Sequence, residues 1–211
     1  MKIISTNIAT PKQIIFRGKT ETTGIFKSPS ESGIFLGLED VKNDEVTDRK
    51  HHGGTYKACY LFSENHYVYW KSLYPDLDWQ YGMFGENLTV VDMDDSQLYI
   101  GSIYAVGDAQ IQITTPREPC YKLGVKFGNQ NVIEQFVTHG NPGTYARVLQ
   151  EGKIAPGDVF HLIEQAENSI TTTQFFSLLY DKSKNIEHLK KAIKNEAVPP
   201  QKRMSLKKFL K

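Results

Sequence analysis

The chain of 211 residues is 39% hydrophobic and 23% charged, the composition of an ordinary globular protein. Its 25 basic and 24 acidic residues leave a formal net charge of +1, so bulk charge gives no reason to bind a nucleic-acid polymer or an anionic membrane. The first residues lack a signal-peptide pattern, and no apolar run approaches the ~18 residues of a membrane-spanning helix. Because two cysteines, Cys59 and Cys120, are too few for a secreted disulfide framework, we expect a cytoplasmic protein.

Residues 1–160 carry the pattern of a mainly β domain. Short runs rich in Ile, Val, Thr, Tyr and Phe alternate with Gly, Pro, Asn and Asp, which is typical of an all-β barrel or sandwich. The runs expected to form strands are residues 3–8, 13–17, 56–62, 87–91, 102–106, 109–114 and 159–164. Gly107 and Asp108 predict a tight hairpin turn, because glycine tolerates positive φ. A further turn is expected within residues 151–158, where two glycines and a proline cluster.

Two helices are expected within this β region. One covers residues 64–73, with Ser63 as a capping residue at its start and Pro75 just beyond its end. The other covers residues 130–137, where apolar residues recur at a spacing of three to four.

The composition changes after residue 168. Helical patterns follow at residues 169–179, 185–194 and 200–210. Thr171 or Thr172 can cap the first of these helices, and Pro200 occupies the first turn of the third, where proline is tolerated. The chain is therefore expected to form a β domain over residues 1–168 and a three-helix unit over residues 169–211. The many lysines of the second unit are interpreted as a solvated face.

Four loop segments carry polar residues that are candidates for binding or catalysis, because functional residues are often held on loops of a rigid scaffold. The first is His-His-Gly-Gly at residues 51–54, where glycines let backbone N–H groups approach an anion; a simple turn explains it as well. The second is Phe-Gly-Glu-Asn at residues 84–87. There Glu86 and Asn87 can hydrogen-bond the polar edge of a heterocycle, and the alternative is a turn entering the next strand.

The third segment is Pro-Arg-Glu-Pro-Cys at residues 116–120. Its two prolines hold the loop extended, and the neighbouring cations Arg117 and Lys122 favour the thiolate of Cys120, the form that ligates a soft metal. The alternative is an inert buried cysteine. That is how we interpret Cys59, which lies inside an apolar run.

The fourth segment is Gly-Thr-Tyr-Ala-Arg at residues 143–147. Arg147 can bind a phosphate through two N–H groups and Tyr145 can stack or donate, unless the segment is an ordinary strand with one exposed arginine. The chain has no C-x-x-C pair, H-E-x-x-H, G-x-x-x-x-G-K-[ST] or G-x-S-x-G motif, so the corresponding zinc, P-loop and hydrolase sites are excluded. A single cysteine can still complete a metal site whose other sulfurs come with a cofactor.

These four segments, in this order, resemble the MOSC domain family, named for the C-terminal domain of molybdenum cofactor sulfurase, and most of all its bacterial YiiM-like branch. The most specific element is the Pro-Arg-x-Pro-Cys-Tyr-Lys-Leu run at residues 116–123; the other motifs are specific mainly in combination. Members often carry a Gly-Asp-x-Gln stretch before the His-Gly-Gly motif, of which this chain retains one candidate acidic residue, Asp44.

The resemblance implies a twisted, partly closed β-barrel with a C-terminal three-helix unit. It also implies a molybdenum–pyranopterin cofactor whose dithiolene supplies two sulfurs, with Cys120 as the protein ligand to the metal. Glu86 and Asn87 are expected to join Cys120 in catalysis, through pterin recognition or proton delivery. The residues expected to bind the cofactor are His52, Gly53, Gly54, Gly85, Arg117, Lys122, Tyr145 and Arg147.

The resemblance further implies reduction of N-hydroxylated compounds, such as hydroxylaminopurine-type base analogues. Since the sequence encodes no flavin, haem or iron–sulfur site, electrons are expected from a separate reductase. Two alternatives stay open: a carrier or storage module for the cofactor, and a sulfur carrier with a persulfide on Cys120. The oligomeric state is not predicted. Because all four segments precede residue 168, we expect cofactor binding to survive deletion of the three-helix unit.

Overall fold

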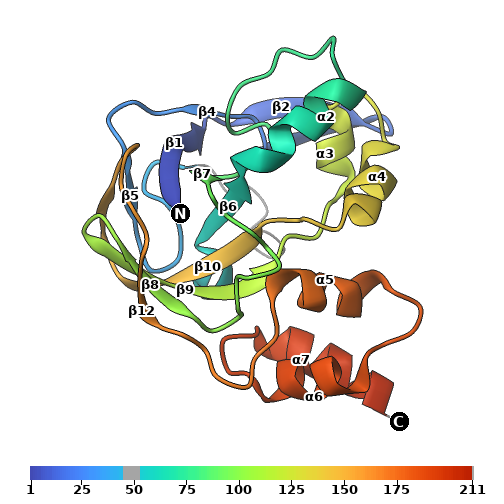
Figure 1. Ribbon diagram of the computed structural model, residues 1–211. Coiled ribbons are helices and arrows are strands. Elements are labelled where there is room, and N and C mark those ends of the chain that lie inside the picture. Colours follow the sequence, from blue (N-terminus) through green and yellow to red (C-terminus); the bar gives the residue numbers. More distant parts are fainter. Residues whose placement is uncertain (45–52, 211) are drawn as a thin grey trace.

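A mixed eight-stranded sheet forms the centre of the molecule in the computed structural model, which describes residues 1–44 and 53–210 (Figure 1). Its strands lie in the order β12 (His161–Glu164), β8 (Ile103–Val106), β9 (Ala109–Pro116), β10 (Thr144–Gln150), β6 (Cys59–Ser63), β7 (Leu88–Val91), β1 (Lys2–Ala9) and β4 (Lys27–Pro29). All neighbours are antiparallel except β6 and β7. This parallel pair needs a crossover connection, which includes the helix α2 (Tyr67–Leu73).

Two further sheets have two strands each. β2 (Lys12–Phe16) pairs with β3 (Lys19–Thr23) through a two-residue turn in which Arg17 and Gly18 both have positive φ. β5 (Ile34–Leu36) pairs with β11 (Gly152–Ile154). The segment expected as a turn over residues 151–158 therefore begins with a short strand, because it finds a partner far away in the sequence.

The two edges of the large sheet do not meet in a continuous ladder within the described residues. A single antiparallel bridge joins Lys2 of β1 to Val159, just ahead of β12, and the N–H of Ile3 donates to the carbonyl of Asp158 (2.9 Å). With its parallel strand pair and its helices, the fold is mixed α/β where a mainly β fold was expected. No closed barrel is present among the described residues, although backbone hydrogen bonds join residues 1–3 to residues 157–160. The spacing of apolar runs indicates strands, but it does not reveal which edges pair.

The expected strands and hairpin are otherwise confirmed. Every run named from the sequence overlaps an observed strand, and β8 and β9 are joined at Gly107, whose φ is 52°. The run over residues 56–62 is divided, because its first part forms the short 3₁₀ helix η1 (Thr55–Lys57) and only the second part belongs to β6.

Helices on one side of the sheet depart from expectation in detail. The helix over residues 64–73 starts as a 3₁₀ turn, η2 (Glu64–His66), and continues as α2. Ser63 precedes it, but its hydroxyl donates to the carbonyl of Met93 (2.7 Å) instead of capping the helix. The second expected helix is α4 (Val132–His139), and an unpredicted short helix, α3 (Tyr121–Lys126), directly follows Cys120.

The three expected C-terminal helices are confirmed and gather on one side of the sheet (Figure 1). They are α5 (Thr172–Tyr180), α6 (Ile186–Lys194) and α7 (Pro200–Lys207), followed by η3 (Lys208–Leu210). Thr171 caps α5 in a capping box with Gln174. Phe175 and Leu206 are buried in the same core as sheet residues such as Ile113. The division into two domains at residue 168 stays a prediction, and the helices share the core of the sheet.

An aromatic cluster packs α2 and α4 against β6. The rings of Phe62 and Phe84 stack with centroids 4.2 Å apart, and Trp70 stacks on Phe136 at 5.9 Å. All four side chains are fully buried. This cluster holds the loop over residues 84–87 through Phe84, which packs among the rings of β6, α2 and α4.

Candidate functional site

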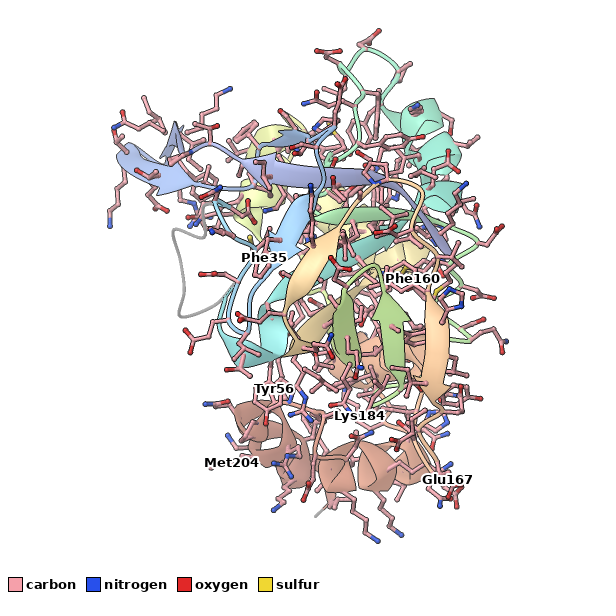
Figure 2. All side chains as sticks on the ribbon, turned by 90° about the vertical axis from the view of Figure 1, so that its left-hand side faces the viewer. Phe35, Tyr56, Phe160, Glu167, Lys184 and Met204 are labelled. Carbon is pink, nitrogen blue, oxygen red and sulfur yellow. The ribbon has the colours of Figure 1, made fainter. Side chains whose placement is uncertain are left out.

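A cavity of about 900 Å³ is lined by three parts of the chain that lie far apart in the sequence. They are the loop that leads into η1, the loop that carries Cys120, and the start of α7, with Tyr145 of β10. The described lining residues are Gly53, Gly54, Thr55, Tyr56, Lys57, Glu118, Pro119, Cys120, Tyr121, Lys122, Tyr145, Pro199, Gln201 and Lys202. Figure 2 shows Tyr56 between the sheet and the C-terminal helices, of which α7 carries Met204. The cavity brings together residues of the first, third and fourth polar segments.

Cys120 lies at the end of the proline-containing loop, directly before α3. Its backbone is extended (φ −130°, ψ 169°), and its carbonyl accepts a hydrogen bond from the N–H of Leu123 (2.9 Å). The thiol is half-buried and lines the cavity. Cys59, by contrast, is buried in β6, and this burial raises the pKa of its thiol far above the ordinary value. The interpretation of Cys59 as a core residue is confirmed.

The loop after Cys120 is held by the N-terminal hairpin. The ring of Tyr121 stacks on Phe16 of β2, with centroids 4.4 Å apart, and its hydroxyl donates to the Glu21 carboxylate of β3. These contacts tie the hairpin to the rim of the cavity next to the thiol.

Three lysines and one carboxylate give the described part of the lining a net positive charge. Lys122 of α3 is buried, and Lys57 lies over the ring of Tyr145, 5.4 Å from its centroid. Lys202 of α7 forms an ion pair with Glu118. A concave surface with this balance favours an anionic ligand.

Gly53 and Gly54 form the edge of the cavity ahead of η1. Gly54 has φ of 84°, and no atom of the described residues lies within 4 Å of the position that a Cβ would occupy. The glycine therefore allows a backbone angle that other residues avoid, and it leaves open space beside the backbone for a ligand. His52, expected to bind the cofactor, lies outside the described residues.

Tyr145 is the residue of the fourth segment that lines the cavity. It is buried beside Tyr60, with ring centroids 5.2 Å apart. Burial raises the pKa of Tyr145 to about 12, against the opposing effect of the Arg117 guanidinium. The phenol therefore keeps its proton at neutral pH and can donate a hydrogen bond.

The two arginines expected to bind the cofactor, Arg117 and Arg147, are not among the described residues that line the cavity. Arg117 is buried with its guanidinium over the rings of Tyr60 and Phe136, at 5.6 and 5.1 Å from their centroids. One of its terminal nitrogens finds no hydrogen-bond partner among the described residues. Arg147 is half-buried with its guanidinium over Tyr56, 5.7 Å from the centroid. Both guanidinium groups therefore lie over aromatic rings. Of the three rings that they contact, only that of Tyr56 belongs to a residue of the lining.

Glu86 also lies outside the cavity and is fully buried. Its carboxylate accepts hydrogen bonds from the N–H groups of Gly82 (2.9 Å) and Phe84 (3.0 Å). The hydroxyls of Tyr67 and Thr89 donate to it as well. Since four donors of the fold occupy this carboxylate, its placement gives no support to the expected catalytic role.

Asn87 and Gly85 complete the same structural turn. The side-chain oxygen of Asn87 accepts from the N–H of Tyr60 (3.1 Å), and its nitrogen donates to Asp44 (2.8 Å). Gly85 has φ of 81°, and a Cβ there would lie 3.1 Å from the side chain of Ile25. The second polar segment therefore joins strands inside the fold, and the structure does not bring it to the cavity.

The sequence did not point to the wall that α7 contributes. Gln201 and Lys202 lie about 80 residues from Cys120 in a lysine-rich stretch interpreted as a solvated face, and no motif marks them. Because α7 forms part of this cavity, the structure favours a role for the C-terminal helices, against the expectation that cofactor binding survives their deletion, which stays a prediction.

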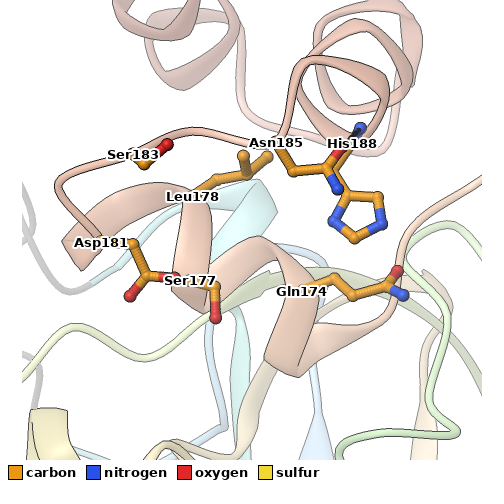
Figure 3. A pocket seen from close by; sticks show the side chains of 7 residues that line it. All are labelled: Gln174, Ser177, Leu178, Asp181, Ser183, Asn185 and His188. Carbon is orange, nitrogen blue, oxygen red and sulfur yellow. Dashed lines mark hydrogen bonds between the residues drawn. The ribbon is translucent and has the colours of Figure 1, made fainter.

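A second, smaller cavity of about 250 Å³ lies between α5 and α6 (Figure 3). Its lining residues are Gln174, Ser177, Leu178, Asp181, Ser183, Asn185 and His188. Asn185 is occupied as the cap of α6, since its side chain accepts from the N–H of His188 (3.0 Å). None of the site residues expected from the sequence lies here.

The described residues also limit what kind of metal site is present. Across residues 1–44 and 53–210, no three His, Cys, Asp or Glu side chains come together in a way that would hold a metal ion. A metal at Cys120 would therefore find too few ligands among these residues, and a cofactor could supply the others. None of the described helices has the length and apolarity needed to cross a membrane.

The fold and the cysteine-lined cavity place the protein in a known class. Residues 48–161, more than half of the chain, match the model of the MOSC domain. The uncharacterized protein YflK of Bacillus subtilis is 31% identical over 206 residues, covering 98% of this chain and 93% of YflK. The chain therefore belongs to the MOSC domain family.

Within the family the chain is YiiM-like. YiiM of Escherichia coli is 32% identical over 135 residues, which cover 63% of this chain and 59% of YiiM. The crystal structure of YiiM from Geobacillus stearothermophilus superposes with a TM-score of 0.83 at 28% identity, covering 100% of this chain and 99% of the other. A protein of Gibberella moniliformis named "Reductase" is 33% identical over 148 residues, or 68% of this chain and 26% of that protein.

Proposed function

We propose that this chain binds a molybdenum–pterin cofactor in the cavity of about 900 Å³ and reduces N-hydroxylated compounds there. The observation that carries the proposal is the position of Cys120, whose half-buried thiol lines the cavity beside Lys122. MOSC domains are associated with this cofactor, and one relative bears the name of a reductase, which supports the class of reaction.

The residues around the cavity fit such a cofactor in size and chemistry. Ligand pockets span roughly 300–1,000 Å³, so the space suffices. Cys120 would ligate the metal, because a thiolate suits a soft metal position. Lys57 and Lys122 offer positive charge for a phosphate, and the open backbone at Gly54 would lie beside it.

The reaction removes oxygen from nitrogen. When bound, the cofactor supplies the two-electron redox chemistry that this step requires. For each R–NH–OH consumed, two electrons and two protons enter, the N–O bond breaks, and R–NH₂ and water leave; a separate reductase provides the electrons. The protonated Oη of Tyr145 donates a hydrogen bond that orients the ligand in the cavity.

The test is to purify the protein from cells that synthesise the cofactor and to measure molybdenum, pterin and turnover of an N-hydroxylated base analogue with an added reductant. We expect near-stoichiometric molybdenum and pterin together with turnover. Molybdenum and pterin without turnover would indicate a cofactor carrier. A persulfide on Cys120 without molybdenum would indicate a sulfur carrier instead.

A further inference from the structure

The wall of the cavity that α7 contributes lies outside the segment that matches the MOSC domain. That match covers residues 48–161, which contain all other described residues of the lining. Pro199, Gln201 and Lys202 come instead from the start of the last helix. A cofactor common to the family has to be bound by the shared segment, so the α7 wall can serve what is particular to those relatives that match the chain over its whole length.

Lys202 is the one charged residue on this wall, and a carboxylate near Cys120 holds it. Its Nζ forms an ion pair with Glu118, which lies two residues before Cys120 in the same loop. The two side chains are partly exposed, 25% for Lys202 and 35% for Glu118. The pair therefore joins α7 to the cysteine loop, and water or a ligand can reach it.

We propose that Lys202, assisted by Gln201, selects N-hydroxylated substrates that carry an anionic group, either a carboxylate or a phosphate. This inference rests on the proposed function and names its substrate class. Lys57 and Lys122 lie in the shared segment with Cys120, and the proposed function assigns them to the cofactor. Lys202 lines the same cavity from α7. When a substrate binds, its anionic group replaces the Glu118 carboxylate as the ion-pair partner of Lys202.

The test compares matched neutral and anionic substrates. Benzamidoxime is paired with 4-carboxybenzamidoxime, and 6-hydroxylaminopurine with its ribonucleoside monophosphate, so that the two pairs distinguish a carboxylate from a phosphate. We expect Lys202→Gln to lower kcat/KM for the anionic member of at least one pair about tenfold, mainly through KM, and to change the neutral member less than about twofold. Glu118→Gln should lower KM for the anionic member, because it removes the competing carboxylate.

Lys207→Gln is the matched control, because Lys207 lies on the same helix, is exposed and is absent from the lining. We expect it to behave as the wild type with all four substrates. If Lys202→Gln lowers kcat/KM for neutral and anionic members equally, or for neither, the inference is overturned while the proposed function stands.

A binding measurement separates the inference from the proposed function. Calorimetry gives the dissociation constants of 4-carboxybenzamidine and benzamidine, the corresponding reduced products, for the wild type, Lys202→Gln and Lys207→Gln. A loss of about tenfold for the carboxylate compound in Lys202→Gln alone supports the inference even if no substrate is reduced. Adenosine monophosphate and adenine, the reduced products of the second pair, are measured in the same way. Equal affinities of all three proteins for both anionic products contradict the inference.

Discussion

At the scale of single residues, the two cysteines differ through their surroundings. Cys120 lines the cavity and Cys59 is buried in β6. Serine at position 120 replaces a soft ligand by a hard oxygen, so Cys120→Ser should abolish molybdenum retention with little change in melting temperature. Cys59→Ser buries a hydroxyl and should cost about 1–3 kcal/mol of stability while the folded protein retains the metal. Metal content and thermal melting of both variants check this; full molybdenum content in Cys120→Ser would remove the ligand assignment.

Asp95 is a buried carboxyl whose titration should affect stability. One oxygen accepts from the N–H of Gly143 (3.1 Å), and the other has no partner in the described part of the chain. Burial raises its pKa from 3.8 to about 7. The folded state therefore binds more protons than the unfolded state between these values, and stability is lost as pH rises through this window.

Asp95→Asn should remove that pH dependence. The amide keeps an acceptor for Gly143 but carries no charge, so the variant should be more stable than the wild type above pH 7 and gain less or nothing near pH 5. Melting temperatures of both proteins between pH 5 and pH 8 provide the check. Parallel curves would show that the carboxyl does not titrate as the structure indicates.

At the scale of elements, the turn over residues 84–87 joins α2, β6 and β7 through the side-chain hydrogen bonds of Glu86 and Asn87. Glu86→Ala would leave the N–H groups of Gly82 and Phe84 buried without an acceptor, at about 1–3 kcal/mol for each. We expect a large loss of unfolding free energy in denaturant titrations. Molybdenum per folded molecule should be unchanged, because Glu86 lies outside the cavity.

Glu134→Ala is the control for this loss, since Glu134 is exposed on α4 and its removal should change stability little. A Glu86→Ala protein of normal stability that has lost all turnover would restore the catalytic role expected from the sequence.

At the scale of the whole molecule, the C-terminal helices complete both the core and the cavity. A chain that ends at residue 168 loses the buried side chains of Phe175, Leu189 and Leu206 and the wall made by α7. We expect it to melt at a lower temperature or without cooperativity, and to retain less cofactor than the full chain. Circular dichroism melting and molybdenum content test this. A stable truncated protein with full molybdenum would instead support the expectation from the sequence that cofactor binding does not need the C-terminal helices.

Much of the local structure follows from the sequence, because it depends on neighbouring residues. Alternating apolar runs predicted the strands, Thr171 and Gln174 form a capping box over three residues, and the turn at Gly107 needs only a backbone angle that glycine allows. The open edge of the sheet and the parallel pair of β6 and β7 did not follow, since strand pairing depends on partners that are remote in sequence.

Some residues of the candidate site could likewise be identified from the sequence, and others only from the tertiary structure. Cys120 and Lys122 could be identified from the sequence because the proline loop and its flanking cations form one continuous run. The sequence could not decide whether a motif faces the cavity or the core. Only tertiary packing placed Glu86 among four internal donors and brought Lys202 of the last helix beside Glu118 of the cysteine loop. Such contacts join residues far apart along the chain, so no local pattern encodes them.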